Sequence, residues 1–412
     1  MAISPIPHWF EGSEYTHKVA ACIMKYGPIS RITLAQILGL SQGAVSRITS
    51  DLIYAGVIEE TPMAAGQGGR LPKDFVRKNS QKAAQKSGQK ENTERRGRPQ
   101  TGLRIVANAR TFVGMKINTT HITAVAVNAI GQIVTGCHDL PLDDDSPESV
   151  VDVIKQLTMD CADEAVMSGL PAPCAVGVSL GGHITDDSVT TFAPFLHWSK
   201  PVEFSAMIRK ATGLPTGIYN DIDSLAVDAC LFGSGVGLNS FAVVTIGIGV
   251  GYSLTVNGEP VNNPDKSYGL VGHILVDPDG PRCISGHKGC ATCLTDNSIA
   301  TEYSKIIGRP ATFDEFAAAA RASKTQATNL VNRTCFRLGT LIATIANLAM
   351  PDKIMIAGES SFIAKLGVGD LRNGINMYRH SQAAPVDFEI ADHDWAMWGK
   401  AAAAQAIRQY VG

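Results

Sequence analysis

The sequence has no apolar run that reaches the roughly 18 residues needed to cross a bilayer. Its first residues, MAISPIPHWFEGSEYTHK, lack the charged start and the apolar stretch of a secretory signal. It also has little excess charge, because 36 Lys and Arg oppose 38 Asp and Glu and leave a formal net charge of −2. These absences predict a cytoplasmic protein without membrane insertion, whose affinity for any nucleic acid must come from a local basic region.

The length of 412 residues predicts two or three domains with a substantial core. A hydrophobic content of 45% and a charged content of 18% are typical of a globular protein. The nine cysteines are odd in number, and three of them lie near a histidine. This pattern favours reduced thiols and metal binding over disulfides.

The first 66 residues carry three helical patterns in quick succession. THKVAACIMKYG ends at Gly27, RITLAQILGL breaks at Gly39, and Ser41 can cap a third helix, SQGAVSRITSDLIYAG. Two short helices, a tight turn and a polar third helix predict a helix-turn-helix, with GVIEET as the first strand of a wing, although another small three-helix bundle gives a similar pattern. The residues of the third helix expected to reach bases and phosphates are Ser41, Gln42, Ala44, Ser46 and Arg47.

A basic connector follows at residues 67–104, where eleven Lys or Arg face three Asp or Glu. Few apolar residues are present, so the segment cannot bury enough surface to fold alone, and residues 78–94 are expected to be a solvated linker. The run Arg95-Arg96-Gly97-Arg98-Pro99 differs, because a flat arginine-rich segment can lie in a narrow A·T minor groove. We therefore predict that Arg96 and Arg98 bind DNA.

Thiols and imidazoles gather in the segment GLVGHILVDPDGPRCISGHKGCATCLTD, residues 269–296. Its glycines and prolines make a tight loop that can bring His273, Cys283, Cys290 and Cys293 toward one point. Such a ligand set suits a structural zinc ion (Zn2+), whereas the simpler interpretation is a loop with buried free cysteines.

The fourth zinc ligand is the open question of this segment. A cysteine is preferred because a thiolate binds zinc more tightly than an imidazole, and no general base lies nearby to suggest a catalytic metal. The candidates for the fourth position are Cys293, which we prefer, His287 and the poor ligand Ser285.

Residues 105–412 alternate strand and helix patterns. Two strands joined at residues 118–120 come first, a helix is expected near residues 147–168, and later strands end in glycine, as at Gly181-Gly182. This alternation implies a largely parallel or mixed sheet covered on both sides. The predicted division is a winged helix-turn-helix at residues 1–66, the connector at 67–104 and a two-lobed α/β body at 105–412.

Three motifs make the chain resemble the ROK family of repressors and sugar kinases. GHILVDPDGPRCISGHKGC is similar to the family's GH…VDP.G..C.CG..GC..E signature, apart from Ser285 and Thr292. NDIDSLAVDACLFG resembles the NDANAAALGE motif, and APFLHW resembles P-N-L-x-W. The resemblance covers the helix-turn-helix, the GRP run and nearly all of residues 105–412. It implies an actin-like, ribonuclease-H-like ATPase fold of two lobes with a zinc knuckle.

The resemblance allows the kinase chemistry to be checked residue by residue. Lys116 stands where the family's first phosphate loop has aspartate, and Asn118-Thr119 stand where it has two glycines. In the second loop Ile248 replaces a hydroxyl residue and Tyr252 adds a bulky ring. Asp221 lies at the place of the catalytic base, but side chains fill space that backbone amides should offer to phosphate. We therefore expect no enzymatic activity, with Asp221 as a vestige.

The sugar pocket implied by the resemblance is only partly kept. The family's glutamate is Leu270 here and its asparagine is Phe195, so two partners for sugar hydroxyls are lost, and a less polar or modified ligand is expected unless sugar binding itself is lost. The polar residues after the strand GLPTGIYN alternatively cap a helix. The expected ligand-binding residues are Gly181, Gly182, Asn220, Asp221 and His273.

These features predict a transcriptional regulator of the ROK type, with a repressor of carbohydrate-utilisation genes preferred over an activator. A homodimer is expected because operator half-sites mirror two-fold symmetry, and a tetramer stays open. The expected partners are a double-stranded DNA operator, which would place the protein on the nucleoid, and a sugar or sugar-derived effector. The alternatives are a sugar kinase with an accessory DNA-binding domain and a regulator controlled by a protein partner.

Overall fold

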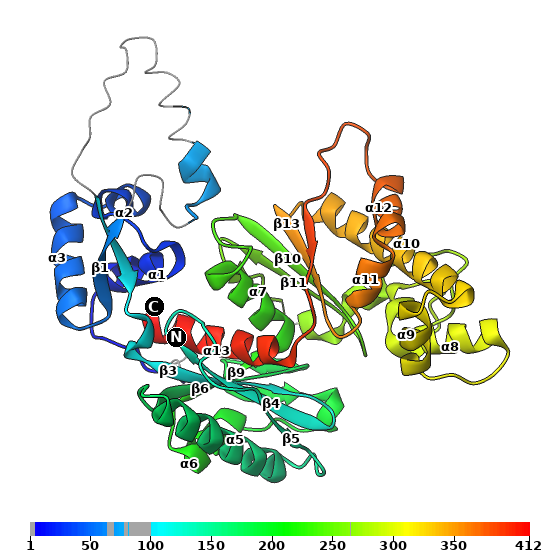
Figure 1. Cartoon of the computed structure of the whole chain (residues 1–412), viewed down its shortest axis with the longest axis horizontal. Coiled ribbons are helices and arrows are strands. Elements are labelled where there is room, and N and C mark those ends of the chain that lie inside the picture. Colours follow the sequence, from blue (N-terminus) through cyan, green and yellow to red (C-terminus); the bar gives the residue numbers. More distant parts are fainter. Residues whose placement is uncertain (1–4, 64–69, 78–80, 82–99, 264) are drawn as a thin grey trace. The chain divides into compact units, whose positions relative to one another are not determined.

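The computed structural model describes residues 5–63, 70–77, 81, 100–263 and 265–412. The chain forms two compact units, of which the first joins Met1–Asn239 to Trp395–Gly412 and the second is Ser240–Asp394 (Figure 1). The predicted DNA contacts Arg96 and Arg98 lie outside the described residues. Among the helices that are described, none is both long and apolar enough to cross a membrane.

Three short helices open the first unit: α1 (Glu14–Tyr26), α2 (Arg31–Leu38) and α3 (Gln42–Tyr54). Each begins after a serine whose hydroxyl accepts a hydrogen bond from a first-turn N–H, and this N-cap satisfies a donor that the helix itself cannot. Gly39 ends α2 with φ 66°, which glycine adopts without a Cβ penalty, and so makes the tight turn before α3. The predicted helix-turn-helix is confirmed.

The wing is an antiparallel pair of strands, β1 (Ile58–Met63) and β2 (Gln100–Ile105). Leu103 of β2 is buried and exchanges two backbone hydrogen bonds with Ile29, at 2.8 and 3.0 Å, so β2 is tied to the helices as well. The sequence analysis had placed residues 100–105 in the connector and at the start of the body. Residues 64–99 therefore join the two strands of the wing, and we call them the wing loop.

The lobe of the first unit is built on a five-stranded sheet of order β5-β4-β3-β6-β9. Strands β3, β6 and β9 are parallel, while β4 and β5 run antiparallel to their neighbours. Helices α5 and α6 cover one face of the sheet, and α13 covers the other (Figure 1). The bounds are β3 (Thr111–Ile117), β4 (His121–Asn128), β5 (His138–Pro141), β6 (Pro173–Leu180), β9 (Thr216–Asn220), α5 (Pro147–Met167), α6 (Phe204–Thr212), α7 (Asp221–Phe232) and α13 (Trp395–Val411).

Helix α13 lies unusually close to the central strands because glycines face it. A Cβ on Gly114 would lie 2.0 Å from the carbonyl oxygen of Gly399, and one on Gly177 would lie 2.2 Å from that of Ala402. The facing turn of α13 is a run of buried alanines, residues 401–404, which also lets the backbones approach. The C-terminal helix is therefore fitted to this sheet by small residues on both sides.

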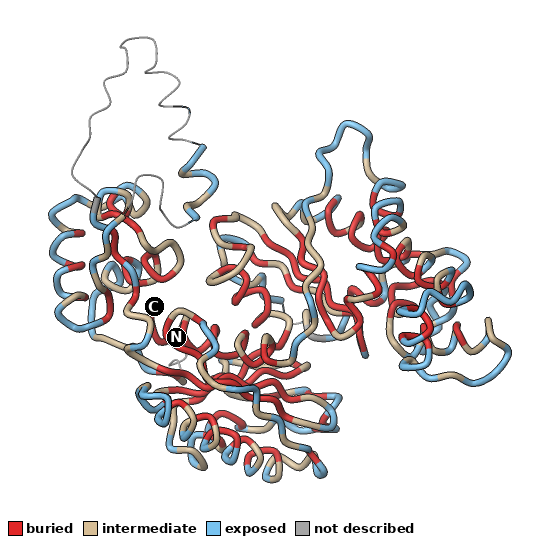
Figure 2. Tube along the Cα trace, in the orientation of Figure 1, coloured by how far each residue is buried: buried red, intermediate tan, exposed pale blue. Residues whose placement is uncertain are grey.

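The winged helix and this lobe share one apolar core, and both contain buried segments (Figure 2). The core joins Leu34 and Val45 of the helix-turn-helix to Phe112 of β3 and Val411 of α13. The backbone N–H of Trp9 also donates to the carbonyl of Tyr410 at 2.7 Å. Consequently the three helices of the helix-turn-helix do not form a separately packed domain.

The second unit has its own sheet, of order β12-β11-β10-β13-β14, with β10, β13 and β14 parallel. Helices α10 and α12 cross closely, since a Cβ on Gly339 would lie 2.2 Å from the carbonyl oxygen of Leu371. The main elements are β10 (Ser240–Ile246), β11 (Val250–Val256), β12 (Glu259–Pro260), β13 (Lys353–Ala357), β14 (Phe388–Ile390), α8 (Asp296–Ile307), α9 (Phe313–Arg321), α10 (Thr325–Leu348), α11 (Phe362–Leu366) and α12 (Val368–Met377).

Short elements complete both units. In the first unit, the hairpin of β7 and β8 and one 3-10 turn follow β6, and a second 3-10 turn precedes β3. Three further 3-10 turns lie in the second unit around the cysteine-rich loop. Their bounds are β7 (His183–Thr185), β8 (Val189–Phe192), η1 (Ala107–Ala109), η2 (Pro194–Leu196), η3 (Lys266–Tyr268), η4 (Leu270–His273) and η5 (Ala291–Leu294).

Candidate functional site

Helix α3 turns a polar face outward over its first turns. Val45, Ile48 and Leu52 are buried and point into the core at helical spacing, so the residues between them face solvent. Four of the five predicted contacts are exposed, and Ala44 is half-buried. The predicted contacts that share this end of α3 are Ser41, Gln42, Ala44, Ser46 and Arg47.

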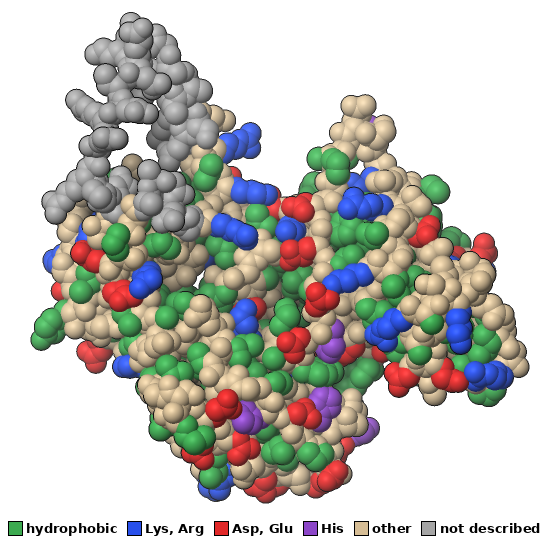
Figure 3. Space-filling view, in the orientation of Figure 1, with side chains coloured by type: hydrophobic (Ala, Val, Ile, Leu, Met, Phe, Trp, Pro, Cys, Tyr) green, Lys and Arg blue, Asp and Glu red, His purple; other side chains and the backbone are tan. Residues whose placement is uncertain are grey.

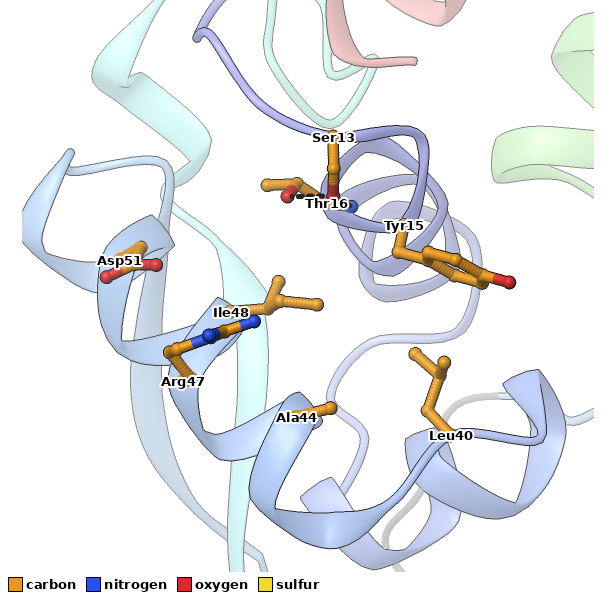
Figure 4. Close-up of a pocket in the computed structure, with 8 residues that line it drawn as sticks. All are labelled: Ser13, Tyr15, Thr16, Leu40, Ala44, Arg47, Ile48 and Asp51. Atoms are coloured by element: carbon orange, nitrogen blue, oxygen red, sulfur yellow. Dashed lines mark hydrogen bonds between the residues drawn. The ribbon is translucent and has the colours of Figure 1, made fainter.

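A groove of about 640 Å³ runs beside this face, between α3 and the start of α1 (Figure 4). Leu40, Ala44 and Ile48 form its apolar part, and Arg47 extends along its edge. On the α1 side, the hydroxyls of Ser13 and Thr16 lie 3.0 Å apart, and Tyr15 and Asp51 complete the lining. The groove adjoins the polar face of α3 and places a cation on it, as a contact with a sugar-phosphate backbone requires.

Acidic side chains dominate a different part of the first unit. Helix α5 carries five Asp or Glu but a single Lys, and acidic groups are frequent on the lower part of the face shown in Figure 3. A surface of this sign repels the phosphates of DNA. Any nucleic-acid contact by this unit is therefore expected at the winged helix and not at the lobe.

Four of the five predicted ligand residues meet at the carboxyl ends of β6 and β9. Asn220 donates from its amide nitrogen to the carbonyl of Gly182 at 3.2 Å, while its amide oxygen accepts from the backbone N–H groups of Ile222 and Asp223. Asn220 is thus the N-cap of α7, as the alternative interpretation proposed. His273 belongs to the second unit.

An aromatic side chain lies beside these residues. A Cβ on Gly181 would lie 3.3 Å from the ring of Phe195 and 3.5 Å from Oδ2 of Asp221. Phe195, which is 44% exposed, therefore stands opposite the carboxylate with only a glycine between them. The arrangement offers a ring face and few free polar groups, which suits a less polar ligand than a free hexose.

Lys116 forms a buried ion pair with Asp221. The ammonium of Lys116 contacts Oδ2 of Asp221, and their side chains are 8% and 12% exposed. The ammonium also lies 5.3 Å from the ring centroid of Trp398, within cation–π range. The other oxygen of Asp221 accepts from the backbone N–H of Ile222 at 2.9 Å. Each oxygen of Asp221 therefore already accepts one hydrogen bond within the protein.

The two loops that hold nucleotide phosphates in kinases are altered in different ways. In the first, Asn118 donates its N–H to the carbonyl of His121 at 2.9 Å and sets its side chain 2.9 Å from the ring of His121. In the second, Gly247 lies against Glu359, whose Oε2 would be 2.2 Å from a Cβ on Gly247. A carboxylate in this place repels a phosphate group.

Glu359 has an acidic neighbour, Asp296, and sequence reasoning identified neither residue. Burial raises the pKa of the Asp296 carboxyl to about 6, with a hydrogen bond from Ser360 acting in the opposite direction and the charges of Glu359 and Asp314 adding to the rise. The backbone N–H of Asp296 donates a hydrogen bond to the carbonyl of Gly247 at 2.9 Å. The available signal was the run AGES after β13, where a carboxylate directly follows a strand-end glycine.

The cysteine-rich loop of the second unit gathers four possible metal ligands. One ligand atom from each of His273, Cys283, His287 and Cys290 lies within 4.8 Å of all the others. The Nδ1 atoms of the two histidines are 3.0 Å apart, and Cys290 is buried. Desolvation raises the pKa of the Cys283 thiol. Hydrogen bonds from Cys290 and from nearby backbone groups together lower it by more, so the pKa lies below its ordinary value. Two imidazoles and two thiols fit a tetrahedral zinc ion.

Cys293, the preferred fourth ligand in the sequence analysis, lies outside this group, and His287 takes its place. Cys293 is in η5 and points into the core of the second unit, where burial raises its thiol pKa to about 12. The turn at Gly286, with φ 84°, instead brings His287 back so that its carbonyl accepts from the N–H of Cys283 at 2.9 Å. Glycine punctuation in the sequence indicated such a turn but did not fix which side chain it returns.

The loop is fastened to the long helix α10 by a buried arginine. Arg337 contacts Asp277 of the loop at 2.8 Å and Glu302 of α8 at 2.7 Å, and its side chain is 4% exposed. Gly289 also packs closely against Asp277, since a Cβ on Gly289 would lie 1.6 Å from the carbonyl oxygen of Asp277. The position of the metal-ligand loop therefore depends on a charge network beneath it.

Zinc content of single variants is expected to separate the two candidate fourth ligands. The purified wild type should carry about one zinc ion per chain, whereas Cys290→Ser and His287→Ala should lose most of it because each removes a donor from the group of four. Cys293→Ser should keep the metal. Elemental analysis after gel filtration measures this, and zinc lost from Cys293→Ser but kept by His287→Ala would contradict the geometry.

Comparison with known proteins gives a consistent family. The model of the ROK family matches residues 112–406. The chain is 23% identical to the DNA-binding transcriptional repressor Mlc of Escherichia coli K12 over 358 residues, covering 84% of this chain and 80% of the relative. It is 24% identical to the DNA-binding transcriptional dual regulator NagC of the same organism over 374 residues, covering 86% and 82%.

Two solved structures show the fold. A ROK family transcriptional regulator described as a homologue of the E. coli MLC protein superposes with a TM-score of 0.71 at 22% identity, covering 96% of each chain. A ROK family glucokinase from Streptomyces griseus, solved with glucose and AMPPNP, superposes with a TM-score of 0.60 at 20% identity, covering 71% of this chain and 98% of the glucokinase. The likeness to the regulator includes the winged helix, whereas the likeness to the kinase covers less of the chain.

Proposed function

The chain belongs to the ROK family, and from that premise we propose that it is a sequence-specific DNA-binding transcriptional regulator, a repressor of carbohydrate-utilisation genes that a sugar or sugar-derived effector releases. One observation carries the proposal: a capped helix with a polar outer face, Gln42–Tyr54, stands in a winged helix-turn-helix that shares its core with the ROK body. The relatives named as a DNA-binding transcriptional repressor and as a DNA-binding transcriptional dual regulator support a regulatory role.

The packing suggests which part of the chain has which proposed role. Residues up to 105 read DNA, because β2 completes the wing, and the remainder is the effector and oligomerisation body. Recognition of a palindromic operator calls for a homodimer or a higher symmetric assembly. Within the wing loop, Arg96 and Arg98 are proposed to enter an A·T minor groove. The place of action is then the cytoplasm, on operator DNA.

We further propose that this chain has lost the phosphoryl transfer of its kinase relatives. The ion pair of Lys116 with Asp221 occupies the residue that would accept the hydroxyl proton. Glu359 beside Gly247 places negative charge where phosphates would bind. Sugar-dependent turnover of ATP would revive the kinase alternative.

Zinc is proposed as a structural ion at His273, Cys283, His287 and Cys290. When bound, it would cross-link the ends of the loop and add to the stability of the second unit. Its closed set of four protein ligands leaves no position for a substrate.

The effector class can be tested by thermal stability. A ligand present at about 100 times its dissociation constant stabilises the folded protein by roughly 2.7 kcal/mol, which gives a clear shift in Tm. A panel of hexoses, amino sugars, sugar phosphates and ATP covers the alternatives. A shift with one sugar class identifies the effector, and a complete absence of shifts favours control by a protein partner.

The DNA-binding role predicts a specific loss for Arg47→Ala. Removing this exposed guanidinium from the first turns of α3 is expected to weaken binding to a selected operator duplex by roughly 1–3 kcal/mol. The matched control is Arg209→Ala, an exposed helical arginine on α6 of the lobe, which should leave the affinity unchanged. Fluorescence anisotropy at fixed salt measures both, and equal affinities for the two variants would count against α3 as the reading helix.

A further inference from the structure

Part of the wing loop contacts the lobe through residues 70–77. The backbone N–H of Lys73 donates to the carbonyl of Gly237 at 2.9 Å. The guanidinium of Arg70 donates to the carbonyl of Gly233 at 3.3 Å. Leu71, between them, is partly buried against the core that the winged helix and lobe share. Backbone, side-chain and apolar contacts thus fasten this segment to residues 233–237, the turn that follows α7.

The receiving turn is shaped for close backbone approach. Gly237 has φ 82°, and a Cβ there would lie 2.6 Å from the carbonyl oxygen of Leu71. Gly235 has little free space toward α7, because a Cβ there would lie 3.0 Å from the sulfur of Cys230 in α7. Glycine is therefore required at Gly237 both for the backbone conformation and for the contact. The turn fits the wing-loop segment on one side and the last turns of α7 on the other.

Helix α7 connects this turn to two of the predicted ligand residues. Asn220 and Asp221 stand at its beginning, and its 12 residues span about 18 Å. Asp228 in its middle is paired with Lys400 of α13 at 2.9 Å. Phe232 at its end packs on Gly131, where a Cβ would lie 2.5 Å from the ring. A short helix packed along its length moves as one body, so a displacement at the pocket reaches the turn.

We propose that residues 70–77 are a docking element whose position is set by α7, so that the state of the predicted ligand residues Asn220 and Asp221 is communicated to this segment between the two strands of the wing. An effector that binds better when α7 is displaced would shift the population toward an altered or released dock. The wing loop holds most of the cations of the basic connector, and phosphate contacts from such cations dominate affinity for DNA. The regulatory part rests on the proposed function, whereas the docking does not.

The docking is tested with two substitutions at one position. Lys73→Pro removes the N–H that Gly237 accepts, yet proline is well tolerated here because residues 73–77 form a helical turn that begins at this residue. Lys73→Ala removes the same side chain and keeps the N–H. In the full-length protein without DNA or ligand, Lys73→Pro is expected to raise hydrogen exchange at residues 74–77 roughly tenfold, with Lys73→Ala close to wild type. Equal exchange in the two variants would overturn the dock.

The communication along α7 is tested from its other end. Asn220→Ala removes the cap and the contact with Gly182, and it is expected to speed exchange at residues 70–77 as well. The matched control is Thr312→Ala, which removes the cap of α9 in the second unit and should leave residues 70–77 unchanged. Unchanged exchange at residues 70–77 in Asn220→Ala would overturn the communication.

Binding to a duplex selected with the wild type completes the test. Lys73→Pro should bind severalfold more weakly than Lys73→Ala, because a released loop must be ordered again on DNA. Equal affinities would overturn the regulatory part of the proposal. If the wild type selects no duplex, the proposed function fails, and the exchange measurements still decide the dock.

Discussion

Replacing Arg337 by alanine is expected to lower the free energy of unfolding of the second unit by roughly 3–5 kcal/mol. The guanidinium is 4% exposed and holds the carboxylates of Asp277 and Glu302, which are themselves 24% and 19% exposed. Its removal leaves two poorly solvated carboxylates without their shared cation. The cost is therefore mainly that of uncompensated buried charge, with lost packing added to it.

Arg333→Ala is the matched control for this prediction. Arg333 contacts the same Glu302 at 3.0 Å, but its side chain is 46% exposed. An ion pair in contact with solvent contributes roughly 0–1 kcal/mol. The same residue type, helix and acidic partner are thus compared in a buried and an exposed setting.

The measurement must report on the second unit alone. All four tryptophans, Trp9, Trp198, Trp395 and Trp398, belong to the first unit, so their fluorescence follows that unit. Hydrogen exchange of α10 follows the second, and Arg337→Ala should reduce its protection by roughly two to four orders of magnitude while tryptophan fluorescence changes little. Similar protection in Arg337→Ala and Arg333→Ala would show that the buried network contributes little.

The secondary structure was largely predictable because its local signals agree with the fold. The helix expected at residues 147–168 is α5, at Pro147–Met167, and the strands expected around residues 118–120 are β3 and β4. The serine caps and Gly39 fixed the helix-turn-helix in the same way. In these segments hydrophobic period, capping and turn residues all favour one structure.

The wing shows where composition misleads. The basic stretch at residues 67–104 has the composition of a linker, and no local signal indicates that Gln100–Ile105 pairs with Ile58–Met63 across a long loop. The pairing is decided by burial of Leu103 and Ile105 against the helices, which is a tertiary effect. Alternation of apolar residues in TGLRI was the one available sign of a strand.

The metal ligands were harder to predict for a similar reason. The sequence identified the loop and three of the four residues that the structure gathers as possible ligands, but the choice between His287 and Cys293 depends on the direction that a glycine turn gives the chain. A preference for thiolate chemistry favoured Cys293, whereas the core of the second unit took that side chain. Packing of Cys293 in the core, and not the strength of its thiolate as a zinc ligand, therefore decides which residue joins the group.

The second large effect is expected at Lys116. Lys116→Ala leaves the carboxylate of Asp221 buried without its cation and should lower the free energy of unfolding of the first unit by roughly 3–5 kcal/mol. The sequence named both residues but not their pairing. Strand register explains it, because Lys116 pairs with Ser179 of β6, and Ser179 pairs with Tyr219 of β9, two residues before Asp221. The carboxyl ends of these parallel strands meet at one edge of the sheet.

A double substitution separates the charge effect from the fold. Lys116→Met with Asp221→Leu removes both charges at similar volume, so it should recover most of the stability lost by either single variant. Urea unfolding followed by tryptophan fluorescence measures all of these variants in the unit where the pair lies. If the double variant is as unstable as Lys116→Ala, the loss comes from packing beside Trp398 and not from unpaired charge.

Restoring the aspartate of the kinases at position 116 should also fail to restore catalysis. Lys116→Asp places two carboxylates together, and their repulsion adds to the cost of burying them. The second phosphate loop still carries Glu359 against Gly247, so a bound nucleotide would meet negative charge there. Even Lys116→Asp combined with Glu359→Gly should therefore show no sugar-dependent ATP hydrolysis above the wild type, because Asn118 still contacts His121 in the first loop and Ile248 still replaces the hydroxyl residue of the second. Turnover by this double variant would mean that the two charges alone separate this chain from its kinase relatives.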